Sequence, residues 1–186
     1  MKEFKLEVKG KVALDAGAST GGFSDCLLQN GAAKVYAVDV GYGILDWKLR
    51  QDPRVVPVER TNIRYLTLKD LGLRTSDGST ELAEVIGLAT IDVSFISLSK
   101  VLPAVYNLLA GKADVIALIK PQFEARRGQV EKGGIITDEN VRQEVIEKVK
   151  AAAETQGFKV KGLTRSPIEG ADGNIEFLIW LAKGQA

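Results

Sequence analysis

The chain has 186 residues, a formal net charge of +1 at pH 7, 45% hydrophobic residues and 26% charged residues, a balance typical of one soluble globular domain. It contains no histidine, which excludes histidine-based acid–base catalysis, Ser–His and Cys–His nucleophile pairs and His-ligated zinc. Its single cysteine, Cys26, excludes a disulfide framework and a cysteine-rich metal site, and its apolar surroundings predict a buried thiol. We therefore expect no metal, and chemistry carried by Lys, Asp, Glu, Arg, Tyr or backbone groups.

The first half of the chain alternates predicted strands and helices. Residues 11–15 (KVALD) form a short apolar strand that leads directly into a glycine-rich turn, and residues 20–30 have the apolar spacing of a helix. A second strand is predicted at 35–38 and a third at 55–58, with a short helix around Trp47 between them. The alternation predicts strands that are joined by crossover helices.

The second half continues this alternation after a polar surface loop at 75–80 (TSDGST). A buried strand is predicted at 87–92, a helix at 98–109 and the most uniformly apolar strand at 113–119. A long helix is predicted at 138–154, in which the first residue is an aspartate N-cap and charges alternate along the outer face.

Two last strands, at 157–163 and 175–181, are joined by a loop that contains glycine and proline. Strands alternating with helices predict a mainly parallel sheet with helices on both faces. Because no helix separates the last two strands, one of them should run antiparallel, an ending typical of methyltransferases and unlike dehydrogenases. The predicted fold is α/β and Rossmann-like, with a mostly parallel seven-stranded sheet and one antiparallel strand near the C-terminus.

The glycine-rich turn, residues 15–23 (DAGASTGGF), predicts a cofactor site. A dinucleotide fingerprint, G-x-G-x-x-G, fails because Ser19 occupies the second glycine position. The turn instead suits a cofactor without phosphates, S-adenosyl-L-methionine. Asp39 ends the second strand and would accept both ribose hydroxyls of the adenosine, and Asn62, beyond the third strand, would contact the adenine edge. The predicted cofactor contacts are Asp15, Gly17, Ala18, Ser19, Gly21, Gly22, Phe23, Asp39, Val40, Asn62 and Asp92.

A glycine-rich turn taken alone is more often a tight strand–helix junction than a ligand site. The turn, the acid at the end of the second strand and the antiparallel ending together favour a methyltransferase. A dehydrogenase stays the alternative enzyme class.

Four segments carry a resemblance to one family. They are LDAGASTGGFSDCLLQNGAAKVYAVDVGYGILDWKLRQDPRVVPVERTNIR (14–64), IDVSFISL (91–98), LIKPQFE (118–124) and SPIEGADGNIEFL (166–178). In this order, over nearly the whole chain, they are similar to the haemolysin-A (TlyA-type) branch of the FtsJ-like ribose methyltransferases. The resemblance implies one S-adenosylmethionine-dependent domain over 1–186 that methylates a ribose 2′-hydroxyl of ribosomal RNA, at a cytidine, with ribosomal RNA or ribosomal subunits as partner.

FtsJ-like enzymes use a Lys-Asp-Lys-Glu tetrad, and the resemblance carries three of its members onto this chain as Asp92, Lys120 and Glu176. The predicted strands by themselves place Asp92 and Lys120 at carboxyl ends on the cofactor side. A lysine there can take the proton of a poorly nucleophilic ribose hydroxyl while the carboxylates orient it. Each residue alone is more often a solvated or capping group, but three on one rim favour catalysis.

The chain departs from the family pattern upstream of its first strand. The first lysine of the tetrad belongs to a Ser-Arg-Gly-Gly-x-Lys segment, and Met1 falls after that point. The residues of the family's S4-type RNA-binding domain are not in this sequence either, so we expect a fragment of a longer protein or a reduced relative. The sequence as given supports cofactor binding better than turnover. A non-catalytic RNA-binding module therefore stays open.

A haemolysin-like or cytolysin-like protein, which the family name suggests, is disfavoured. The sequence has no stretch long enough for a membrane span, no strongly basic amphipathic helix and no apolar signal-peptide segment at residues 1–10. We expect a cytoplasmic protein without a membrane partner.

Basic residues around the predicted site are candidates for RNA contacts. Residues 126–134 (RRGQVEKGG) are predicted to form a mobile basic loop over the active site, with Arg126 where the family has glycine. A basic residue taken alone more often serves only to keep the protein surface soluble. The candidate phosphate contacts are Lys48, Arg50, Arg60, Arg64, Arg126 and Arg127.

Overall fold

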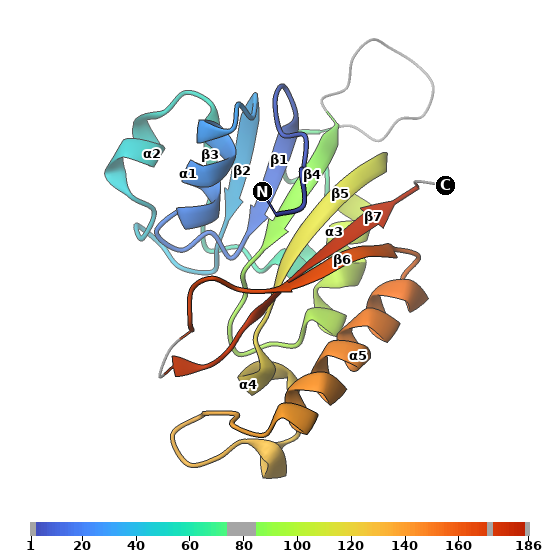
Figure 1. The fold of residues 1–186 in the computed structure, drawn as a ribbon. Helices are drawn as coiled ribbons and strands as arrows, with labels where there is room; N and C mark the ends of the chain where they lie inside the picture. The colour runs from blue at the N-terminus through green and yellow to red at the C-terminus, as the bar shows by residue number, and fades with distance from the viewer. Residues whose placement is uncertain (1–2, 74–84, 171–172, 185–186) are drawn as a thin grey trace.

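The structure is a computed structural model that describes residues 3–73, 85–170 and 173–184. A seven-stranded sheet lies at its centre, in the order β3-β2-β1-β4-β5-β7-β6 (Figure 1). The strands are β1 (Val12–Ala16), β2 (Lys34–Val38), β3 (Val55–Val58), β4 (Ile86–Ile91), β5 (Leu109–Ile119), β6 (Lys159–Arg165) and β7 (Phe177–Lys183). The neighbours among β1 to β5 pair in parallel, whereas β7 is antiparallel to both β5 and β6. The predicted topology, with one antiparallel strand near the C-terminus, is confirmed.

Helices cover both faces of the sheet (Figure 1). They are α1 (Gly22–Gln29), α2 (Trp47–Gln51), α3 (Leu102–Leu108), α4 (Pro121–Glu124) and α5 (Glu139–Thr155), with short 3-10 turns η1 (Ile63–Tyr65), η2 (Leu98–Lys100) and η3 (Arg127–Gln129). Successive residues of β1 point to opposite faces, so Ala13 packs in one core with α1 and α2, whereas Leu14 packs in the other with α3 and α5. Among the residues described, no helix is long and apolar enough to cross a bilayer.

Four predictions about local structure are corrected or stay outside the described residues. The helix predicted at 98–109 is divided into η2 and α3, because Pro103 lacks an amide hydrogen and is placed in the first turn of a new helix. The chain then extends from Leu109, so β5 is longer than the predicted strand at 113–119. Cys26 is half-buried rather than buried. The polar loop predicted at 75–80 lies outside the described residues.

Gly21 was predicted to contact the cofactor, but in the structure it packs against α2 and the segment before it. It precedes α1 with φ 102°, a left-handed conformation that favours glycine. A Cβ at this position would lie 2.1 Å from Cδ1 of Leu49 and 2.9 Å from Cδ1 of Leu45. The missing side chain therefore leaves room for α2 and the segment before it, and not for a ligand.

Replacing Gly21 by alanine should lower the free energy of unfolding by about 1–3 kcal/mol, because the new methyl group meets left-handed strain and two buried leucines. The matched control is Gly22→Ala, where a Cβ has nothing within 4 Å, and this variant should be as stable as the parent or slightly more so. Urea unfolding of the three proteins measures the difference. Equal stabilities for the two variants would contradict the packing role.

Candidate cofactor and catalytic site

The ends of the strands bring the predicted site residues to one edge of the sheet. The carboxyl ends of parallel strands share an edge, and the antiparallel β7 begins there. Ile119 at the end of β5 pairs with Phe177 at the start of β7, so Lys120 and Glu176 are the next residues at that edge. Asp92 directly follows β4, next to β5. All three predicted catalytic residues therefore share this edge with the glycine-rich turn.

A cavity of about 700 Å³ opens at the same edge, a size that suits a nucleoside-like ligand. It is bounded by the segments that follow β1, β2, β3 and β4 and by Phe123 of α4. The predicted cofactor contacts that line it are Gly17, Ser19, Asp39, Val40, Asn62 and Asp92.

The carboxylate of Asp39 is held in position at the rim of this cavity, where it can bind hydroxyl groups. Its carboxylate accepts hydrogen bonds from the backbone N–H groups of Ser19 and Gly41, each at 2.8 Å. Ser19 has φ 50°, an uncommon conformation for a serine, so the turn after β1 is held toward Asp39. Since a carboxylate has about four lone-pair sites, both oxygens can still accept the hydroxyls of a ribose.

Asn62 also lines the cavity, but its carbonyl oxygen is already committed. It accepts from the backbone N–H of Arg64 at 3.1 Å and from Nε of Arg64 at 3.2 Å, which caps η1. Contact with an adenine edge would therefore come from its amide nitrogen.

Five predicted cofactor contacts do not line the cavity: Asp15, Ala18, Gly21, Gly22 and Phe23. Asp15 has no exposed surface, and its carboxylate accepts from Oγ of Ser24 at 2.6 Å and Oγ1 of Thr90 at 2.9 Å, so it supports the turn from beneath and cannot touch a ligand directly. Gly17 does line the cavity, but its φ of 83° and missing Cβ have a second use. A Cβ there would lie 2.1 Å from the carbonyl oxygen of Asp92.

Burial strongly affects the Asp15 carboxyl. Desolvation raises the pKa of Asp15 from 3.8 to about 6, and the hydrogen bonds from Ser24 and Thr90 offset only part of that cost. The negative charge of Asp92 acts in the same direction as burial. The acid that begins the glycine-rich turn is therefore a titratable group of the core.

Lys120 and Asp92 form the central ion pair of the site. Nζ of Lys120 lies 2.6 Å from Oδ1 of Asp92 and donates to Oγ of Ser94 at 3.0 Å. Glu176 is 6% exposed and accepts from Nε2 of Gln122 at 3.1 Å. Burial raises the pKa of Glu176, and the Gln122 hydrogen bond and the charge of Lys120 counteract only part of the effect. The predicted catalytic residues are thus brought together as expected.

The sequence analysis missed three polar residues of this region. Ser94 holds the amine of Lys120, and Gln122 holds Glu176. The third, Glu124, is 4% exposed and accepts from the backbone N–H of Leu98 at 2.5 Å and from Oγ of Ser97 at 2.7 Å. All three lie inside the segments 91–98 and 118–124, so their signal was proximity to a predicted catalytic residue.

The family of the chain follows from comparison with known proteins. The model of the FtsJ-like methyltransferases matches residues 1–183. The chain belongs to this family. It is 45% identical over 181 residues to the 16S/23S rRNA (cytidine-2′-O)-methyltransferase TlyA of Mycobacterium tuberculosis, covering 97% of this chain and 63% of the relative. The FtsJ-like chain thus spans 63% of the length of the first curated relatives it matches.

Solved structures agree with the family. A hemolysin-named protein from Lactococcus lactis is 52% identical, with a TM-score of 0.89 over 99% of this chain and 84% of that chain. An S-adenosylmethionine-dependent methyltransferase from Mesorhizobium loti shares the fold at 12% identity, with a TM-score of 0.66 over 98% of this chain and 95% of that chain. The predicted Rossmann-like methyltransferase fold is confirmed.

The residues of the FtsJ-like cavity fit S-adenosylmethionine, the cofactor of such methyltransferases. Asp39 offers acceptors to ribose hydroxyls, and Asp92 adds a second carboxylate to the lining. These carboxylates suit a sulfonium cation. An acid at the end of the second strand can also bind the ribose of a dinucleotide, so the dehydrogenase alternative is disfavoured by the failed glycine fingerprint at Ser19 and by the antiparallel β7.

The candidate RNA contacts are divided between two places. Lys48 of α2 is exposed, as are Arg60 and Arg64 in the segment that follows β3, and Arg64 lines the cavity itself. Arg50 is committed to Glu59 through an ion pair of 2.5 Å. Arg126 lines a different hollow, of about 730 Å³, together with residues of α5, and Arg127 begins η3 beside it.

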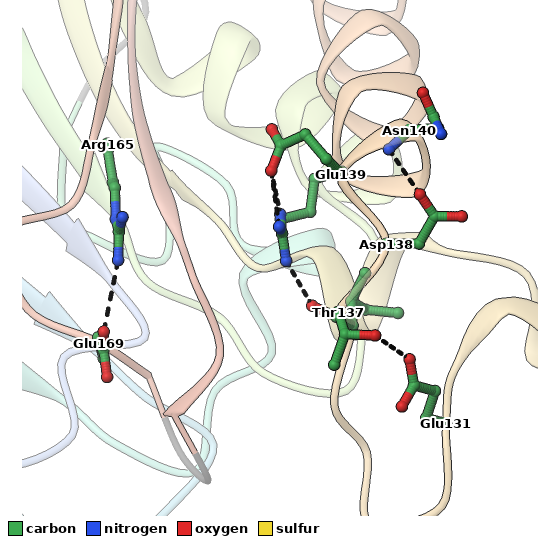
Figure 2. A network of polar contacts seen from close by, with 9 residues as sticks. Glu131, Thr137, Asp138, Glu139, Asn140, Arg165 and Glu169 are labelled. Carbon is green, nitrogen blue, oxygen red and sulfur yellow. Dashed lines mark hydrogen bonds and ion pairs between the residues drawn. The ribbon is translucent and has the colours of Figure 1, made fainter.

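The loop predicted to be mobile is anchored to its neighbours. Nε2 of Gln129 donates to Glu144 of α5 at 2.9 Å, and Asn174 binds the loop through Gly134 and Ile136 at 3.0 and 3.1 Å. Figure 2 shows where the loop joins α5: Thr137 donates to Glu131, and the carboxylate of Asp138 accepts from the N–H of Asn140 at 2.8 Å. The predicted N-cap at Asp138 is confirmed.

The Asp15 carboxyl gives a test by pH. Because its pKa is higher in the folded than in the unfolded protein, the folded state binds more protons between pH 4 and 6, and stability is lost as pH rises through this window. Asn does not titrate, so the free energy of unfolding of Asp15→Asn minus that of the parent should rise by about 3 kcal/mol from pH 4 to pH 7, as measured by urea unfolding. Ser24→Ala should steepen the parent's loss, because it removes a hydrogen bond that favours the ionised form. A difference between parent and Asp15→Asn that does not change with pH would contradict the assignment.

Glu124 connects α4 to η2 and, through Nζ of Lys148 at 3.6 Å, to α5. Glu124→Gln keeps one acceptor oxygen of the two and removes the buried charge that faces Lys148, so it should cost about 1–3 kcal/mol of unfolding free energy. The control is Glu147→Gln, which removes an exposed ion pair with Lys150, keeps an oxygen that can accept from Gln143 and should cost less than about 1 kcal/mol. Thermal and urea unfolding give both values, and equal losses would show that Glu124 is an ordinary surface-type pair.

Proposed function

We propose that the chain is the S-adenosylmethionine-binding, methyl-transferring domain of an enzyme that methylates a ribose 2′-hydroxyl of ribosomal RNA, at a cytidine. The observation that carries the proposal is the 2.6 Å ion pair between Lys120 and Asp92, placed beside a cavity that Asp39 and Asp92 both line. Transfer to a hydroxyl requires a proton acceptor beside the cavity, and the amine of Lys120 can take this role once its ammonium has released a proton.

Asp39 and the turn at Gly17 and Ser19 would hold the adenosine part of the cofactor, which when bound supplies a methyl group on a sulfonium. The amine of Lys120, in its neutral form, accepts the proton of the ribose hydroxyl. Asp92 then balances the charge of the ammonium, and Ser94 fixes its direction through the hydrogen bond at 3.0 Å. Glu176 interacts electrostatically with Lys120 and is therefore a second carboxylate that orients the amine.

The substrate is inferred from the relatives and from the charges at the rim. The Mycobacterium tuberculosis relative is named a 16S/23S rRNA (cytidine-2′-O)-methyltransferase, and a Campylobacter jejuni relative, 35% identical, a 23S rRNA (cytidine-2′-O)-methyltransferase. Lys48, Arg60 and Arg64 are exposed and are suited to phosphate contacts. Ribosomal RNA or a ribosomal subunit is the partner that these features favour.

The test combines calorimetric titration of S-adenosylmethionine with tritium transfer to ribosomal RNA. Asp39→Ala should weaken cofactor binding about 10-fold or more, because it removes the acceptor for the ribose. Lys120→Ala should leave the cofactor Kd within about twofold and lower transfer about 10²–10⁴-fold. Lys112→Ala, an exposed lysine near the other end of β5, is the matched control and should change neither.

Each part of the proposal can fail separately. Absence of heat at millimolar cofactor would overturn the cofactor site. Binding without transfer by the parent chain would overturn methyl transfer by this chain and favour a binding module. Full transfer by Lys120→Ala would overturn the role of Lys120 as proton acceptor.

A further inference from the structure

Two exposed tyrosines stand beside the cavity and have no packing role that explains them. Tyr42 is 68% exposed and Tyr65 is 72% exposed. They belong to the segments that follow β2 and β3, which are neighbours in the sheet. Large exposed apolar groups near a polar site indicate a binding surface rather than a stabilising contact.

Tyr42 is paired with a guanidinium group. Cζ of Arg60 lies 4.2 Å from the centroid of the Tyr42 ring. The backbone fixes this arrangement: Arg60 has φ 51°, and its N–H donates to the carbonyl oxygen of Gly41 at 2.9 Å. A non-glycine residue in this conformation is strained, which points to a functional constraint. Since one face of the ring is taken by Arg60 and the residue is still 68% exposed, the other face is open to solvent.

The same pairing recurs one strand further along the sheet. Cζ of Arg64 lies 5.1 Å from the centroid of the Tyr65 ring. Arg64 is held in turn by Asn62, which accepts from its backbone N–H and from its Nε. Arg60 and Arg64, two of the five arginines predicted to contact phosphates, therefore each lie against an aromatic ring.

Neither tyrosine belongs to the cofactor cavity. Val40 and Ile44 line it on either side of Tyr42 in the sequence, and Asn62 and Arg64 line it just before Tyr65, but the two rings do not. The rings therefore flank the cavity, where they can meet a second ligand without displacing the cofactor.

We propose that the Tyr42–Arg60 and Tyr65–Arg64 pairs form a stacking surface for unpaired bases of an RNA strand. The inference rests on the proposed function for the identity of the ligand as RNA. An aromatic face accepts any nucleobase, and an arginine stacked behind it strengthens the contact and can reach a phosphate. Double-stranded RNA would not use these rings, because its bases are already stacked on one another. The target nucleotide is accordingly expected in a single-stranded or looped segment.

The test measures RNA affinity by fluorescence anisotropy, with a single-stranded oligoribonucleotide and with the duplex of the same sequence. Tyr42→Ala and Tyr65→Ala should each weaken binding of the single strand about 10-fold, and Tyr42→Phe, which keeps the ring, should stay within about twofold of the parent. Arg60→Ala should also weaken it. Arg54→Ala is the matched control. Arg54 lies before β3, at the opposite end from Arg60, and forms an ion pair with Asp52 at 2.7 Å.

The outcomes separate this proposal from its alternatives. Unchanged single-strand affinity in both alanine variants would overturn it, and so would an equal loss for the duplex, which indicates phosphate contacts alone. Weaker S-adenosylmethionine binding by Tyr42→Ala, measured by calorimetry with RNA affinity unchanged, would assign the ring to the cofactor instead. Failure of the proposed function appears elsewhere, as absent cofactor heat or absent methyl transfer in the parent protein, and leaves the stacking result independently readable.

Discussion

The backbones after β1 and after β4 approach each other so closely that only glycine fits at residue 17. A Cβ there would lie 2.1 Å from the carbonyl oxygen of Asp92, and the N–H of Asp92 donates to the carbonyl oxygen of Ala16 at 2.9 Å. This close approach of the two backbones, called the crossing below, fixes the position of the Asp92 backbone and so of its side chain. The 2.6 Å ion pair then fixes the position of the Lys120 amine. A bulkier residue at 17 would push the end of β4 away from the turn, so the cavity and the amine of Lys120 would be displaced together.

The charges around this crossing are separated in a way that suits two different ligands. Carboxylates lie inward, with Asp39 and Asp92 in the cavity lining and Glu176 buried next to Gln122. A cationic sulfonium is favoured in such surroundings, whereas a phosphate is not. Arg60 and Arg64 lie at the rim, where Arg64 also lines the cavity, and each contacts the ring of a tyrosine. Phosphates of a nucleic acid can therefore be bound at the rim without competing for the inner, anionic part of the site.

The sequence was sufficient to predict where a candidate side chain lies wherever the end of a strand determines that position. Parallel strands share their carboxyl edge, so locating the ends of the strands at Asp39, Asp92 and Lys120 also locates these side chains in space. The packing of Gly21 and the buried hydrogen bonds of Asp15 could not be predicted in this way, because both depend on residues distant in the chain. Leu49 fills the space beside Gly21, and Thr90 shares a hydrogen bond with Asp15 across 75 residues, and neither neighbour can be deduced from the spacing of a glycine-rich turn.

The segment after β5 shows why a site of this kind needs contacts that no local pattern reveals. Lys120, Gln122 and Glu124 alternate along α4 and its N-cap, and each is committed to a different part of the molecule. Lys120 binds the segment after β4, Gln122 binds Glu176 at the start of β7, and Glu124 binds η2 and Lys148 of α5. A helix of four residues has little stability of its own, so these three long-range contacts are what hold it in place. The same contacts fix the amine of Lys120 relative to Asp92 and Glu176, and α4 cannot shift without disturbing all of them.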